Sequence, residues 1–110
     1  MNIEVLINTT ESWDNKIKDI GNIESKVEQR VSFKYFGTKK IKRFIPSCSC
    51  TSISNKNNNE VTLIFTPSKL SPQTKKLTDH YELTRKVTVN YVDNTRDELI
   101  VKAKVYDKLD

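Results

Sequence analysis

The sequence predicts a single all-β domain over residues 1–110, and three observations lead to that prediction. Isoleucine, valine and threonine contribute 30 of the 110 residues, and their branched side chains favour strands. Alanine, the best helix former, occurs once, at Ala103. Apolar and polar residues alternate through short segments separated by turn residues, which is typical of an antiparallel β-sandwich of seven to eight strands.

The first half of the chain contains four predicted strands, which cover Ile3–Ile7, Trp13–Ile23, Val27–Phe36 and Lys40–Ile45. The first lies in an N-terminal arm over residues 1–12, and the second is interpreted as an edge strand that ends at Gly21. The third alternates most clearly, with one apolar and one polar face. The fourth is expected to pair with the third in a hairpin that turns at Gly37.

The second half contains four more predicted strands, which cover Thr51–Ser54, Glu60–Thr66, Arg85–Val92 and Asp97–Tyr106. In the last three, every second residue is apolar and is expected to face the core. Residues 55–59 are predicted to form a polar loop. A small barrel is the alternative architecture.

The connection over residues 68–83 has no strand period and is longer than usual for a small domain, and such loops are often functional. Ser71 followed by Pro72 is typical of a helix start, so a short helical turn is expected within Pro72–Thr78. Apolar residues of this connection are candidates for contacts with a partner, namely Leu70, Leu77 and Tyr81. Trp13 is either such an anchor or a member of the core.

The composition excludes several classes of protein. The chain has two glycines, so it lacks the glycine-rich loops that bind phosphates or dinucleotides. No apolar run approaches the ~20 residues of a membrane span. The start of the chain lacks the basic region and apolar run of a signal peptide. His80 is interpreted as a surface histidine, and we expect no catalytic residue, metal or cofactor.

The net charge of +5 comes from 19 basic and 14 acidic residues, and we interpret this excess mainly as a solvated surface. The basic residues gather in two places, Lys39, Lys40, Lys42 and Arg43 in the first half, and Lys75 and Lys76 in the long connection. Phe36 and Phe44 flank the first group. Cationic and aromatic residues together bind single-stranded nucleic acids, so this group is a candidate for binding a polyanion.

Cys48 and Cys50 are the only cysteines. Two cysteines without a secretion signal favour a reducing compartment, so we expect two small, partly buried thiols. A metal or a disulfide shared between subunits is the alternative. A site for one metal within the chain is not expected, because too few further ligands are present.

Three stretches of this sequence together resemble a known family. They are Ile20-Gly21-Asn22-Ile23, residues 27–38, and Pro46-Ser47-Cys48-Ser49-Cys50-Thr51. The chain is similar, over about residues 17–106, to a bacterial immunoglobulin-like family of unknown function with a Ser-Cys-Gly-Cys-Thr motif, related to major-sperm-protein-like and ASH-type sandwiches. Ser49 stands where that family has glycine. The resemblance implies an immunoglobulin-like sandwich without catalytic activity that binds other proteins.

We therefore expect a non-enzymatic structural or protein-interaction module. The most concrete expectation is a small component of a tailed-phage virion that decorates the capsid or belongs to the neck or tail. Its partners would be other proteins of the assembly, including further copies of the chain, with Ile3–Ile7 or Thr51–Ser54 adding to a neighbouring sheet. The expected location is the virion or the host cytoplasm, and no membrane is involved. A module that binds nucleic acid or another polyanion is the alternative.

Overall fold

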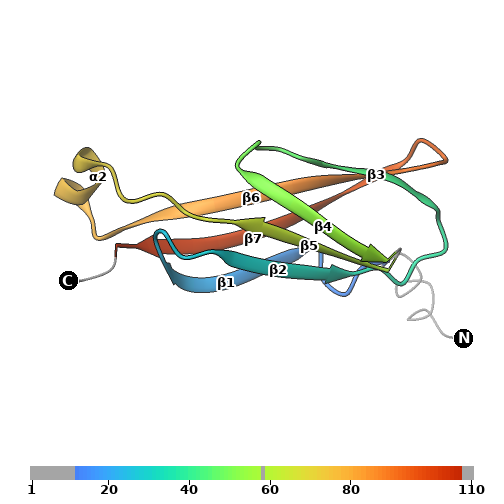
Figure 1. Cartoon of the computed structure of the whole chain (residues 1–110), viewed down its shortest axis with the longest axis horizontal. Coiled ribbons are helices and arrows are strands. Elements are labelled where there is room, and N and C mark those ends of the chain that lie inside the picture. The colour runs from blue at the N-terminus through green and yellow to red at the C-terminus, as the bar shows by residue number, and fades with distance from the viewer. Residues whose placement is uncertain (1–11, 58, 108–110) are drawn as a thin grey trace, which may run out of the picture.

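The computed structural model describes residues 12–57 and 59–107, which form two β-sheets and one short helix (Figure 1). One sheet contains, in spatial order, β1 (Ile17–Glu24), β7 (Arg96–Tyr106), β6 (His80–Tyr91) and β3 (Ile41–Pro46). The other contains β2 (Gln29–Lys34), β5 (Glu60–Phe65) and β4 (Thr51–Asn57). The helix, α2, covers Pro72–Leu77. The prediction of an all-β sandwich is confirmed.

The core lies between the two sheets and follows the predicted alternation. Every second residue of β5, β6 and β7 points inward, because successive side chains of a strand face opposite sides. Fully or nearly fully buried apolar side chains from both sheets meet there, among them Val31, Phe33, Val61, Leu63, Phe65, Val87, Val89, Leu99, Val101 and Val105. These strands therefore pack with the predicted faces inward.

The first strand differs from the prediction in direction and in length. β1 pairs with β7 in parallel, so this sheet is mixed rather than purely antiparallel. It begins at Ile17 and continues past Gly21 through a register shift between Asp19 and Asn22. Gly21 has φ 77°, a left-handed conformation that glycine adopts readily. The glycine therefore permits a bulge within the strand and does not end it.

The predicted hairpin between the third and fourth segments is wrong. β2 pairs with β5, and β3 pairs with β6 in the other sheet, so the residues around Gly37 carry the chain from one sheet to the other. A Cβ atom at Gly37 would overlap the ring and hydroxyl of Tyr35. That hydroxyl accepts a hydrogen bond from the Lys39 amide at 2.9 Å and donates one to the Lys39 carbonyl at 3.1 Å. Glycine is thus needed at position 37 because the Tyr35 side chain lies close to its backbone, and not because the chain forms a hairpin turn there.

Two further strands are longer than predicted. β4 continues to Asn57, so the polar loop expected over residues 55–59 is shorter. β6 begins at His80 rather than Arg85, which shortens the long connection. The helical turn is confirmed as α2, and the Ser71 hydroxyl accepts a hydrogen bond from the Thr74 amide at 3.2 Å. The predicted strand Ile3–Ile7 lies outside the described residues.

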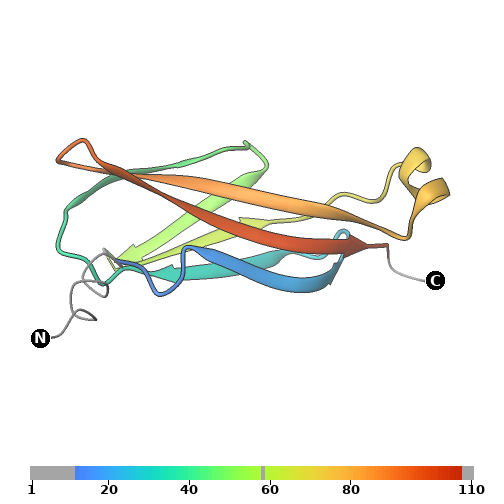
Figure 2. The same ribbon diagram turned by 180° about the vertical axis from the view of Figure 1, so that it is seen from behind.

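The described part of the molecule is elongated, with extents of 55 × 31 × 20 Å. The β6–β7 hairpin runs along its length. α2 lies at one end, and the turn between β6 and β7 lies at the opposite end (Figures 1 and 2). Among the described residues, no helix has the length and apolar character needed to cross a membrane.

Candidate functional site

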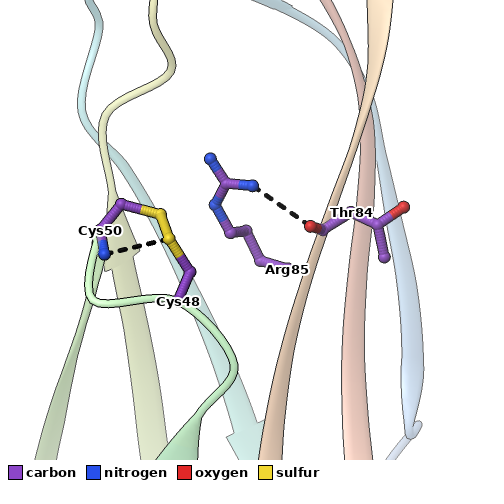
Figure 3. The surroundings of a disulfide bond; sticks show 4 residues. All are labelled: Cys48, Cys50, Thr84 and Arg85. Carbon is purple, nitrogen blue, oxygen red and sulfur yellow. Dashed lines mark hydrogen bonds between the residues drawn. A yellow bond between two sulfur atoms is a disulfide. The ribbon is translucent and has the colours of Figure 1, made fainter.

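The loop between β3 and β4 joins the two sheets and contains a disulfide bond. β3 is an edge strand of one sheet and β4 is an edge strand of the other, so residues 47–50 cross between them. Cys48 and Cys50 are bonded through their sulfur atoms, with Cα atoms 5.1 Å apart (Figure 3). The expectation of two free thiols is wrong. The chain turns at residues 48–51, where the Thr51 amide bonds to the Cys48 carbonyl, and the resulting Cα separation suits a disulfide.

One backbone hydrogen bond joins this disulfide loop to β6, and two further hydrogen bonds lie within the loop. The Ser47 amide donates to the Lys86 carbonyl of β6 at 3.0 Å, and the Thr51 amide donates to the Cys48 carbonyl at 3.2 Å. The Cys50 amide donates to Cys48 Sγ at 3.1 Å. Cys48 is half-buried and Cys50 is exposed. The disulfide is therefore held in place and still open to solvent.

Arg85 is a member of this site that the sequence interpretation missed. It extends from β6 toward the disulfide loop (Figure 3), and its guanidinium carbon lies 5.8 Å from the centre of the Phe65 ring. One hydrogen bond runs from Nη1 to the Thr84 carbonyl at 3.2 Å. The alternation of β6 could have identified Arg85, because this charged residue falls on the inward, apolar face between Leu83 and Val87.

The same crossover holds two buried polar atoms without a hydrogen-bond partner, Arg85 Nε and Thr51 Oγ1. Buried polar groups are normally hydrogen-bonded, so unsatisfied ones need an explanation. Arg85 Nε is thus an unpaired donor on a cationic side chain that extends toward the disulfide loop (Figure 3). A cation near a cysteine favours its thiolate.

The predicted basic residues do not form one surface. Lys39 lies near the β6–β7 turn, where its Nζ is 3.4 Å from Asp93 Oδ2. Lys42 and Arg43 are both exposed, because the register of β3 shifts between Ile41 and Arg43. Lys40 is exposed beside them, whereas Lys75 and Lys76 belong to α2 at the opposite end of the molecule (Figure 1).

The three predicted anchors of the long connection have different surroundings. Leu77 is 87% exposed on α2, a helix that buries none of its residues. Leu70 is buried, and Tyr81 is half-buried and donates a hydrogen bond to the Ser68 carbonyl at 2.7 Å. Leu70 packs inside the domain and therefore offers little of its side chain to a partner. Leu77 alone presents most of its side chain to solvent.

Asp107 links the connection that carries α2 to the sandwich through hydrogen bonds and an ion pair. Its Oδ1 accepts hydrogen bonds from the Leu70 amide at 3.1 Å and from the Ser25 hydroxyl at 2.8 Å. Lys75 Nζ lies 3.0 Å from its Oδ2. The hydrogen bond from the Leu70 backbone, followed by that from Lys75, lowers the pKa of Asp107 to about 2. The ionised carboxylate is thus the form that holds this end together.

Trp13 belongs to the core, which is one of the two interpretations that the sequence left open. Its ring is 3% exposed and lies 4.9 Å from that of Tyr35. Its Nε1 donates to the Tyr91 hydroxyl at 3.0 Å, and Tyr91 donates to Asp97 Oδ2 at 2.6 Å. Burial, together with the bond to Asp97, raises the pKa of Tyr91. Burial also acts to raise the pKa of Asp97, but hydrogen bonds from Tyr91 and then Lys16 lower it.

His80 stands at the start of β6 and not in a loop. Its Nδ1 lies 2.9 Å from Asp79 Oδ1, and its ring lies 5.1 Å from that of Tyr106. The hydrogen bond with His80 lowers the pKa of Asp79. Within residues 12–57 and 59–107, no three histidine, cysteine or acidic side chains are grouped so that they could hold a metal ion.

No family model matches the chain, and no curated protein matches it. Among solved structures, the chain is similar to the endo-fucoidan hydrolase MfFcnA4 from glycoside hydrolase family 107, with a TM-score of 0.59 at 11% identity. A variant of the same enzyme gives a TM-score of 0.60 at 11% identity. Each match covers 88% of this chain and 14% of the other. At this identity the likeness shows the fold alone, and the chain spans a small part of those proteins.

Proposed function

We propose that the chain is an immunoglobulin-like sandwich of the family that its sequence resembles. The strand orders support this proposal. If β2 to β7 correspond to strands B to G, one sheet has the order B-E-D and the other contains C-F-G, as in immunoglobulin domains. In this assignment β1 corresponds to the first strand, A, and it pairs with strand G. The Ser-Cys-x-Cys-Thr run lies at the C-to-D crossover in this assignment.

We propose further that the chain acts as a non-enzymatic protein-interaction module in a larger assembly, which it contacts through α2. The observation that carries this proposal is Leu77, which is 87% exposed on a helix that buries no residue in its own domain. Ordering a segment costs conformational entropy, and α2 gains no apolar burial within the domain in return. An apolar pocket on a partner would accept Leu77 as an anchor. We propose a tailed-phage virion as the first assembly to examine.

A charge at position 77 tests this proposal. Leu77→Asp should reduce incorporation of the chain into its native assembly at least tenfold, because a carboxylate would enter an apolar pocket. Val92→Asp is the matched control, since Val92 is an exposed apolar residue, 56% accessible, that directly follows β6 at the opposite end. Native mass spectrometry of the isolated assembly measures incorporation. Equal incorporation of the two variants would contradict the proposal.

A polyanion-binding module is the second candidate function, and the irregular register of β3 favours it. Lys42 and Arg43 are consecutive yet both exposed, and Lys40 adds a third cation beside them. Phosphate binding weakens steeply as salt is added. If this function is correct, single-stranded DNA should bind at low salt, and the double variant Lys42→Glu, Arg43→Glu should abolish binding while Leu77→Asp leaves it unchanged.

A further inference from the structure

We propose that the Cys48–Cys50 disulfide is a thiol–disulfide exchange site that accepts electrons from thiols. In this proposal a thiolate attacks the sulfur of Cys50, and Cys48 leaves as a thiolate. Arg85 is the positioning residue, because its guanidinium stabilises the thiolate that leaves. The reductant belongs to the class of thiols, either two molecules of a monothiol or one dithiol.

Access to the two sulfur atoms favours attack at Cys50. Cys50 is exposed and Cys48 is half-buried. The hydrogen bond of Ser47 to Lys86 attaches the loop to β6, and that of Thr51 to Cys48 closes the turn within the loop. An incoming thiolate therefore meets Cys50 from solvent, while Cys48 stays close to the sandwich.

One group already contacts the leaving sulfur, and the side chain of a second extends toward the disulfide. The Cys50 amide already donates to Cys48 Sγ at 3.1 Å. The Arg85 side chain extends toward the disulfide (Figure 3), and its buried Nε has no hydrogen-bond partner. A cation next to a cysteine favours its thiolate. Formation of a Cys48 thiolate would thus give the unpaired Arg85 donor a charge to interact with.

The exchange balances in two steps. In the first, the attacking sulfur bonds to Cys50 Sγ, the bond between the two cysteines breaks, and its electron pair stays on Cys48. In the second, another thiolate attacks the sulfur of the first reductant and releases Cys50. The reductant is oxidised to a disulfide by two electrons, and the protons of its thiols pass to the released cysteine sulfurs or to solvent.

A purely structural role for this bond is less well supported. A disulfide stabilises a fold mainly by constraining the unfolded chain, and this effect grows with the length of the closed loop. The loop from Cys48 to Cys50 spans three residues, so the entropic effect is roughly half that of a 15-residue loop. The backbone and its hydrogen bonds to β6 already fix the crossover.

The test uses the full chain, incubated in buffers of reduced and oxidised glutathione and, separately, with dithiothreitol. Alkylation followed by mass spectrometry gives the reduced fraction, and Trp13 fluorescence shows whether the fold persists. We expect complete reduction by dithiothreitol, and reduction by glutathione to an extent set by the ratio of its reduced and oxidised forms, both without loss of the fold. We expect Arg85→Met to make reduction by glutathione about tenfold less favourable, which corresponds to about 30 mV for two electrons.

Lys86→Met is the matched control. Lys86 is the next residue, is exposed, and carries the same charge on the opposite face of the sheet, so its loss should change the equilibrium less than twofold. Arg85→Gln serves as a second neutral variant in case Arg85→Met does not fold. The proposal is overturned if the wild-type disulfide is reduced only in denaturant, or if the neutral variants at positions 85 and 86 have equal equilibria.

Discussion

At the scale of single residues, Trp13 has the largest predicted effect on stability. It is the only tryptophan, it packs against Tyr35, and its indole donates to Tyr91. Trp13→Ala should lower the free energy of unfolding by about 3–5 kcal/mol, because a buried aromatic ring is lost and a cavity remains. Urea unfolding followed by circular dichroism measures this change.

Phe36→Ala is the control for that experiment. Phe36 is an aromatic residue of the same end, but 68% of it is exposed, so its removal should change the free energy of unfolding by about 0.5 kcal/mol or less. Equal effects of the two substitutions would contradict the placement of Trp13 in the core.

The two glycines should respond differently to substitution. Gly37→Ala forces Tyr35 to move, although both hydrogen bonds of its hydroxyl fix it, and should cost about 1–3 kcal/mol of unfolding free energy, as overpacking does. At Gly21 a Cβ atom would meet open space, and the positive φ of this residue is one that asparagine tolerates. Gly21→Asn should therefore cost less than Gly37→Ala in the same urea experiment, and the reverse order would contradict the two roles.

At the scale of elements, the connection that carries α2 should loosen in acid. The pKa of Asp107 is lowered to about 2, so its stabilising effect is fully present above its ordinary pKa of 3.8 and is lost as the pH falls from about 4 to 2. The protection factor of the Leu70 amide against exchange with deuterium, which corrects for the intrinsic pH dependence of exchange, should fall across this range. Asp107→Asn should show low protection already at neutral pH and little further change, whereas the same acid dependence of protection in that variant would contradict this assignment.

Alternation predicted which segments form strands but not how they pair. In β5, β6 and β7 the buried residues repeat every second position, so the sequence alone identified their inward faces. The partner of a strand depends on contacts far apart in the chain, and Gly37 looks the same in a hairpin turn as in a crossover between sheets. The parallel pairing of β1 with β7 left no local signal either.

The candidate site was predictable only in part, because it too depends on contacts between residues far apart in the chain. Cys48 and Cys50 were identified as a pair from their spacing, but the turn that brings their sulfur atoms together was not predicted. The disulfide was not expected, because the sequence analysis predicted a reducing compartment, where structural disulfides are rare. Arg85 lies 35 residues after Cys50 in the chain, and only the pairing of β3 with β6 brings it to the loop.

At the scale of the whole molecule, the features proposed for function lie at separate places along the sandwich. α2 and Leu77 lie at one end, the exposed cations of β3 lie toward the other, and the disulfide loop joins the two sheets at their edges (Figure 1). An interaction surface at one end leaves the disulfide open to solvent. Contact with a partner and thiol exchange can therefore be tested independently.

Photo-crosslinking in the native assembly shows directly whether α2 contacts a partner. A photoreactive amino acid is placed at position 77 in one variant and at position 92 in another, and the crosslinked peptides are identified by mass spectrometry. We expect a single partner peptide, rich in apolar residues, crosslinked from position 77 and not from position 92. Crosslinks from position 92 alone, or none from position 77 in the intact assembly, would contradict the proposed contact.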